Sequence, residues 1–242
     1  MKKLIGLMLL LAPLAVHADE GVKLQTAPVN LENKASLQRG AQIFANYCLS
    51  CHSANYMRYN RLQDLGLTTD QISQNLMFAS DKVGARMTVA MNPADAAKWF
   101  GNAPPDLTDI ARSQGANWLY TYLLSFYRDN SRPTGWNNAL FKNVAMPFPL
   151  WQQQGEQKLV VDQVTGPNGK KVEVDHLVLA KPGTMTPTQY QAMVGDLVNY
   201  LVYLGEPIQE TRKKDGIFVL LFLAVFFIPA YYLYKEYWKD IH

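Results

Sequence analysis

The chain has 242 residues, enough for one large domain or two small ones, and its 48% apolar and 18% charged residues are typical of a globular protein. The formal net charge is +3, but residues 19–210 carry 16 basic against 17 acidic side chains. Because this body has no basic stripe, the sequence excludes nucleic acid from the expected partners.

The N-terminus, residues 1–18, has the three parts of a secretory signal peptide. Two lysines form a short basic region, residues 4–16 are almost wholly apolar, and Val16 and Ala18 occupy positions −3 and −1 of a cut after Ala18. A lasting membrane span would need a longer apolar run and a stop-transfer flank. We therefore expect cleavage after residue 18 and export of the body, which in a bacterium places it in the periplasm.

A helix is predicted directly after an extended arm. Residues 19–34 are polar with little periodicity, whereas apolar and small side chains recur every three to four positions from Leu37 to Phe44, as in a helix over residues 36–47. Gly40 lies in the middle of this helix, where glycine costs roughly 1 kcal/mol of helix stability. We expect it to allow close contact with another helix.

This helix leads into the only two cysteines of the chain, Cys48 and Cys51, which are followed at once by His52. The pattern C-x-x-C-H is typical of covalent attachment of a c-type haem, with thioether bonds from both cysteines and the histidine as an axial iron ligand. A disulfide or a thioredoxin-like pair would leave His52 without a role and expects a βαβ setting. A structural zinc site needs four ligands, and the other histidines are scattered.

The middle of the chain holds more sequence than a minimal cytochrome c. Residues 58–99 are predicted to be largely helical and polar, with a break at Asn92-Pro93. Residues 101–107, GNAPPDL, predict a stiff loop, and a further helix is expected over residues 118–127.

Two elements are predicted near the end of the body. Apolar alternation over residues 157–179, interrupted by the turn sequence at residues 166–169, predicts a β-hairpin. Thr186 and Gln189 then form a capping box with proline at the first helical position, so a helix is expected over residues 187–204. A first helix with C-x-x-C-H crossed by such a terminal helix is similar to the frame of class I cytochromes c.

A haem that only carries electrons needs a sixth iron ligand, usually histidine or methionine. The mature body offers His176, which falls in a predicted strand, and seven methionines. Met146 lies in a proline-rich loop, residues 143–149, and Met185 lies just ahead of the last helix, where small cytochromes c commonly place their ligand. Spacing alone leaves the choice between these two methionines open.

The C-terminal region, residues 211–242, predicts a membrane anchor. Residues 217–234 carry no charge and as a helix would span about 27 Å, and aromatic residues gather at their C-terminal end. Pro229 bends such a helix slightly without forbidding it. A buried core helix is the alternative, but nothing amphipathic interrupts the run. Basic residues at 212–214 outnumber those that follow the span, yet the export signal overrides this bias, and the C-terminus is expected in the cytoplasm.

Four segments together resemble the cytochrome c1 family, the haem subunit of the cytochrome bc1 complex (quinol–cytochrome c oxidoreductase). They are CLSCHSANYMRYNRL at 48–62, APPDLTDIARS at 103–113, NVAMPFPL at 143–150 and QAMVGDLVNYLVYLGEP at 191–207. The resemblance implies a mainly α, class I cytochrome c-like haem domain with extra loops and a small β-hairpin, plus one C-terminal transmembrane helix. The boundaries are then a signal peptide at 1–18, a periplasmic haem domain at 19–210 and the anchor with its short tail at 211–242.

The same resemblance assigns site residues. It implies Met146 as the sulfur ligand, which leaves Met185 in the core, and it places Pro104 and Pro105 along the haem edge. Arg112 is then the candidate partner of a haem propionate, although the family often has a second basic residue where this chain has Gln114.

The implied function is a fixed electron relay with one covalently attached haem c and no catalytic site of its own. It would take single electrons from the Rieske iron–sulfur protein and pass them to a cytochrome c, beside cytochrome b, in a dimeric complex held in the bacterial inner membrane. One alternative is a membrane-bound cytochrome c that serves a terminal oxidase or a dehydrogenase. Another is a haem enzyme or ligand sensor, which needs an open sixth position.

Overall fold

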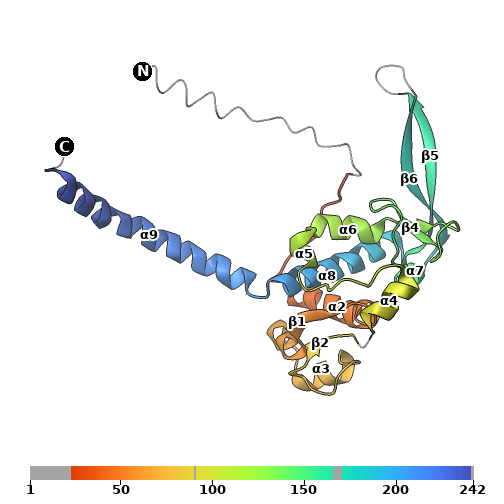
Figure 1. The fold of residues 1–242 in the computed structure, drawn as a ribbon, viewed down its shortest axis with the longest axis horizontal. Coiled ribbons are helices and arrows are strands. Elements are labelled where there is room, and N and C mark those ends of the chain that lie inside the picture. The colour runs from red at the N-terminus through yellow and green to blue at the C-terminus, as the bar shows by residue number, and fades with distance from the viewer. Residues whose placement is uncertain (1–22, 90, 166–170, 241–242) are drawn as a thin grey trace.

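The computed structural model describes residues 23–89, 91–165 and 171–240, so the expected signal peptide and the expected turn at 166–169 lie outside the described residues. Its centre is the crossing of two helices, α2 (Lys34–Ile43) and α8 (Pro187–Gly205), which lie against each other in the body of the domain (Figure 1). A methyl group at Gly40 would lie 2.1 Å from the carbonyl oxygen of Asp196. The close helix contact predicted at Gly40 is confirmed.

Both helices begin as the sequence predicts. The side chain of Asn33 caps α2, and Thr186 and Gln189 form the expected capping box of α8. The arm before α2 has neither helix nor strand in its described part, and side chains of the body hold it. Buried Asn199 on α8, for example, accepts a hydrogen bond from the amide of Asn30 and donates one to its carbonyl oxygen.

The region expected to be largely helical over residues 58–99 is only partly so. It contains a 3-10 helix, two short helices and one short strand: η3 (Tyr59–Leu65), α3 (Thr69–Asn75), β2 (Arg86–Met87) and α4 (Pro93–Phe100). Strand β2 pairs with β1 (Ala54–Arg58), which ends at the first residue of this region. Ser80, Asp81 and Gly84 favour turns rather than helix between α3 and β2. The predicted break is confirmed, because Asn92 caps α4.

The helix expected over residues 118–127 ends earlier than predicted. After the short α5 (Ile110–Ser113), the helix α6 spans Ala116–Leu124, and Phe126 and Tyr127 instead belong to strand β3 (Phe126–Arg128). This strand pairs with β4 (Trp136–Asn138) in an antiparallel hairpin, an arrangement that suits aromatic side chains. A loop then leads to the short helix α7 (Trp151–Gln154).

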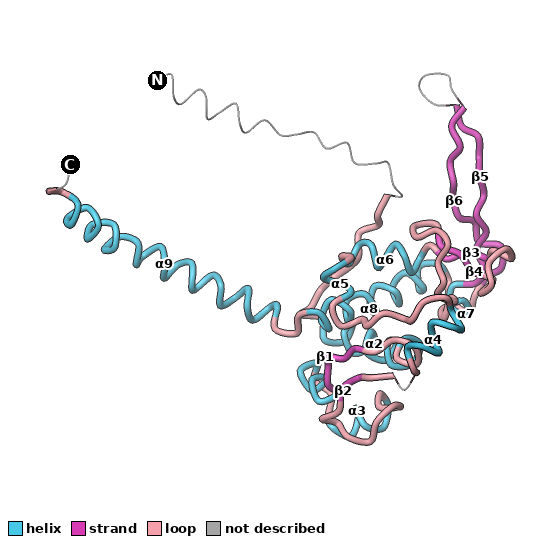
Figure 2. Tube along the Cα trace, in the orientation of Figure 1, coloured by secondary structure: helices cyan, strands magenta, loops and turns pink. Residues whose placement is uncertain are grey.

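The predicted β-hairpin is confirmed and is longer than expected. Strands β5 (Gly155–Thr165) and β6 (Lys171–Pro182) pair antiparallel from Gly155 opposite Pro182 to Thr165 opposite Lys171. They form a two-stranded ribbon that projects from the helical body, as Figure 2 shows in magenta.

The last helix, α9 (Gln209–Trp238), leaves the body in another direction (Figure 1). It is 30 residues long, contains Pro229 and buries none of its residues against the body. It is long and apolar enough to cross a membrane. The fold class is therefore as predicted: a mainly helical domain with small antiparallel sheets, followed by one C-terminal apolar helix.

Candidate metal centre

The two cysteines lie in one tight turn that follows helix α2. A π-helical turn, Phe44–Cys48, ends the helix, and the carbonyl oxygen of Cys48 accepts hydrogen bonds from the amides of Cys51 and His52 at 3.0 and 2.8 Å. Both thiols are free. Burial, and then the proximity of Cys51, raises the pKa of Cys48 to about 12, so this thiol is neutral near pH 7.

His52 is oriented by a backbone carbonyl from the proline-rich loop. Its Nδ1 lies 2.7 Å from the carbonyl oxygen of Pro105. A carbonyl oxygen can only accept, so Nδ1 carries the proton and Nε2 keeps its lone pair for a metal. Burial lowers the pKa of His52, against smaller opposing effects of Pro105 and Asp106, so the imidazole is neutral near pH 7. A neutral imidazole with one oriented nitrogen is the form that binds iron.

The proline loop is itself anchored beside the cysteine turn. The two carboxylate oxygens of Asp106 accept hydrogen bonds from the amides of Asn55 at 2.8 Å and Thr108 at 2.9 Å. The amide of Leu107 donates to the carbonyl oxygen of Ser53 at 2.8 Å. Sequence reasoning missed this positioning role of Asp106, since only the fold brings residues 53–55 next to the loop.

A cavity of about 280 Å³ lies between the same segments. Cys51 and Pro104 both line it, together with the mostly apolar side chains of Val89, Met91 and Pro93. The structure thus brings together the predicted residues Cys51, His52, Pro104 and Pro105. Two thiols in one turn, a histidine nitrogen free to bind and an adjoining partly apolar cavity fit a covalently attached haem.

Met146, the predicted sulfur ligand, is half-buried at the edge of the core. The hydroxyl of Tyr122 donates a hydrogen bond to its Sδ at 3.5 Å. The Tyr122 ring stacks on Trp118 with centroids 4.9 Å apart, and burial raises the pKa of the phenol. No sequence pattern points to Tyr122, because its role depends on helix α6 lying beside the methionine loop.

Met185, the other candidate, is also half-buried. Its amide donates to the carbonyl oxygen of Gln153 at 3.2 Å, and the Gln153 side chain donates to the hydroxyl of Tyr47, the residue before Cys48, at 2.6 Å. Both methionines therefore border the core, and the assignment of Met146 as the iron ligand stays a prediction.

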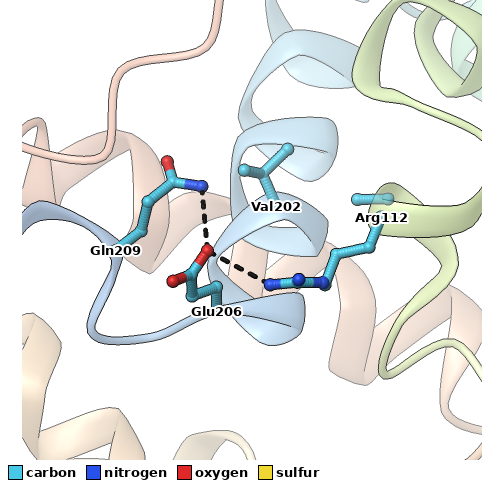
Figure 3. A pocket seen from close by; sticks show the side chains of 5 residues that line it. Arg112, Val202, Glu206 and Gln209 are labelled. Carbon is cyan, nitrogen blue, oxygen red and sulfur yellow. Dashed lines mark hydrogen bonds and ion pairs between the residues drawn. The ribbon is translucent and has the colours of Figure 1, made fainter. Parts of the chain in front are cut away.

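Arg112 lies at the junction of helices α8 and α9. Its Nη1 is 3.1 Å from a carboxylate oxygen of Glu206, which also accepts a hydrogen bond from Gln209 at 3.4 Å (Figure 3). These side chains line a cavity of about 330 Å³. Arg212 pairs with the same carboxylate, and its hydrogen bond is the main reason that the pKa of Glu206 is lowered. The propionate role of Arg112 stays a prediction.

A helical domain with a C-x-x-C-H turn, an oriented histidine and one C-terminal helix apolar enough to cross a membrane has the architecture of a membrane-anchored c-type cytochrome. The model of the cytochrome c1 family matches residues 25–241, and the chain belongs to that family. Members of this family carry covalently bound haem c, which confirms the predicted cofactor and its role in electron transport.

Two relatives align over the whole chain. Cytochrome c1 of Allochromatium vinosum is 49% identical over 245 residues, covering 100% of both chains. A protein of Nitrosomonas europaea named ammonia monooxygenase gamma subunit is also 49% identical, over 100% of this chain and 99% of its own. A chain of a solved hyperthermophilic respiratory Complex III covers 99% of this chain at 14% identity and a TM-score of 0.45, with 94% of its own length matched.

Proposed function

We propose that this chain is the haem subunit of a cytochrome bc1 complex and relays single electrons from the Rieske iron–sulfur protein to a cytochrome c. Its membership of the cytochrome c1 family supports this proposal. The observation that carries it is the 2.7 Å contact between Nδ1 of His52 and the Pro105 carbonyl oxygen, which leaves one histidine nitrogen for iron beside two free thiols. When bound, the haem supplies reversible one-electron redox chemistry.

The residues of the chain take distinct roles in this proposal. Cys48 and Cys51 would form the thioether bonds to the haem, and Nε2 of His52 and Sδ of Met146 would bind its iron. Pro104 and Pro105 flank the haem, and the Pro105 carbonyl keeps the histidine proton on Nδ1. Arg112 can bind a propionate only if its guanidinium binds Glu206 and the propionate together, or if its ion pair with Glu206 breaks.

Filling both axial positions suits a relay better than an enzyme. If His52 and Met146 both hold the iron, no coordination site would be open to a substrate, and the thioether ligand would favour a high potential. An electron can then pass through the domain without a bond being made or broken on it. A reduced spectrum that shifts readily on addition of carbon monoxide would contradict this closed site.

In this proposal the chain has a defined location and orientation in the cell. Cleavage after residue 18 and export place the haem domain, residues 19–210, in the periplasm, and α9 crosses the inner membrane bilayer against cytochrome b with its C-terminus in the cytoplasm. The complex is a homodimer in this proposal. A cysteine added at the C-terminus should resist a membrane-impermeant thiol reagent in intact cells, and labelling from outside would overturn this orientation.

Replacement of the sulfur ligand tests the site. Met146→Leu should lower the midpoint potential by on the order of 0.1 V or more, within the ~0.8 V that axial ligands span. The matched control is Met185→Leu, at the other half-buried candidate, which should leave the potential close to that of the wild type. A large fall in Met185→Leu with none in Met146→Leu would transfer the ligand role to Met185.

Purification of the tagged chain in mild detergent tests the complex. We expect haem b, a [2Fe–2S] cluster and quinol–cytochrome c reductase activity to elute with it. The name of the Nitrosomonas europaea relative provides a second candidate, a membrane-bound cytochrome attached to another oxidoreductase. Co-elution with a terminal oxidase, a dehydrogenase or a monooxygenase, without haem b, would favour that candidate.

A further inference from the structure

In the loop that carries Met146, residues 139–150, the hydrogen bonds to the backbone lie at the two ends, and buried Val144 packs into the core between them. In the part of the chain that the structure describes, residues 144–149 take part in no backbone–backbone hydrogen bond. After the methionine, Phe148 is buried and stacks on Phe126, with ring centroids 4.5 Å apart. The position of the sulfur therefore depends on what holds the loop before the methionine.

Asn138, at the end of strand β4, holds the start of this loop. Its Oδ1 accepts hydrogen bonds from the amides of Leu140 at 2.9 Å and Phe141 at 3.0 Å. Its Nδ2 donates to the carbonyl oxygen of Tyr122 at 2.7 Å, and its side chain is fully buried. The same asparagine thus ties the loop to the residue whose hydroxyl donates to the sulfur of Met146.

Asn137 and Arg132 hold the next turn of the loop, at Asn143. The Oδ1 of Asn137 accepts a hydrogen bond from the Asn143 amide at 2.9 Å, and its Nδ2 donates to Asp129 at 2.9 Å. Arg132 donates to the carbonyl oxygen of Asn143 at 3.0 Å and to its side chain at 3.3 Å. Asn143 has φ of 63°, the only positive value among the described non-glycine residues, a strained conformation that needs such support.

We propose that Asn137, Asn138 and Arg132 are positioning residues for the axial sulfur ligand. Together they form a clamp that holds the loop at Leu140, Phe141 and Asn143, three to six residues before Met146. The inference rests on the proposed ligand role of Met146. A loop that is free before the methionine allows the sulfur to leave the iron more often, because the thioether–iron bond then has to order the loop as well.

Competition by imidazole measures how often the sulfur leaves the iron in the full-length, haem-loaded protein. Imidazole binds ferric haem only when the sulfur has left, so its apparent affinity reports the population of the open state. We expect Asn138→Ala to raise the apparent imidazole affinity at least tenfold and to weaken the sulfur-to-iron charge-transfer band of the ferric protein.

The matched control is Asn199→Ala. Asn199 is also fully buried and hydrogen bonded, but it joins helix α8 to the N-terminal arm. It should lower stability to a similar degree and leave imidazole affinity within twofold of the wild type. Equal increases in both variants would mean a general loss of stability and would overturn the clamp.

A second variant covers the case in which Asn138→Ala does not accumulate with haem. Arg132 is half-exposed, so Arg132→Gln should fold, and it removes the two hydrogen bonds to Asn143. A several-fold rise in imidazole affinity is expected, and wild-type affinity would overturn the clamp. Met146→Leu separates the two proposals. If this variant keeps the charge-transfer band, Met146 is not the ligand and the assignment itself fails. If it loses the band while the Asn138 and Arg132 variants keep wild-type imidazole affinity, only the clamp is refuted.

Discussion

The crossing of helices α2 and α8 at Gly40 gives the sharpest test of how the core of the domain is held together. A methyl group on this residue would lie 2.1 Å from the carbonyl oxygen of Asp196 and 2.6 Å from Cβ of Tyr200. Both atoms belong to the α8 framework rather than to the end of a flexible side chain, so neither can rotate away. Gly40→Ala must therefore push the two helices apart.

Two opposing effects determine how much stability Gly40→Ala loses. Alanine is better than glycine inside a helix by about 1 kcal/mol. Overpacking a tight contact costs typically 1–3 kcal/mol, and contacts this short belong at or above the upper end of that range. The net loss is about 2 kcal/mol, which for a protein of this size lowers Tm by roughly 4–8 °C.

Thermal unfolding of the purified protein, followed by circular dichroism, measures this loss. The control is Gly216→Ala in helix α9, another helical glycine, where a methyl group would meet nothing within 4 Å. That variant should leave the Tm of the haem domain unchanged. A Gly40→Ala protein as stable as the wild type would show that the helices separate at no cost, and the reasoning from close contact would be refuted.

Three further predictions concern the surroundings of the site. Tyr122→Phe removes a hydroxyl dipole whose positive end faces the sulfur of Met146, so a redox titration should show a lower midpoint potential, by less than in the leucine variant of the ligand. Asp106→Ala removes two amide hydrogen bonds from the proline loop and should lower the free energy of unfolding, measured by chemical denaturation, by roughly 2 kcal/mol. An unchanged denaturant concentration at half-unfolding would show that the loop needs no such anchor. The hydrogen bonds from Ser131 above all hold the pKa of Asp129 below its ordinary value of 3.8. Its contribution to stability is therefore complete above that pH and lost as the pH falls below it, so Asp129→Asn should flatten the acid end of the stability profile, and an identical profile would contradict this.

Local patterns predicted those parts of the fold that local interactions determine. The capping box before α8 and the alternation of the β-hairpin each involve residues that are close in sequence, and both elements were confirmed. Gly40 is a special case, since a glycine that weakens its own helix implies a compensating contact even when the partner is distant.

Two of the failures share a physical cause, which is pairing with another strand. Strand β1 pairs with β2 through Ala54 and Met87, across more than 30 residues, and no periodicity within either short segment announces that pairing. Helix α6 ends early because Phe126 pairs with Asn138 of strand β4. In both cases pairing with another strand outweighed a local helical preference.

The same distinction between local and distant signals applies to the proposed haem site. Cys48 and His52 are marked by their own side chains and spacing, so the sequence alone points to them. The group that orients the histidine is a backbone carbonyl 53 residues away, which carries no side-chain signal. Adjacent prolines have no N–H groups and favour an extended backbone without internal hydrogen bonds. The carbonyl of Pro105 is thus left free to accept, and a stiff Pro-Pro segment near a ligand histidine is itself a readable sign of such an acceptor.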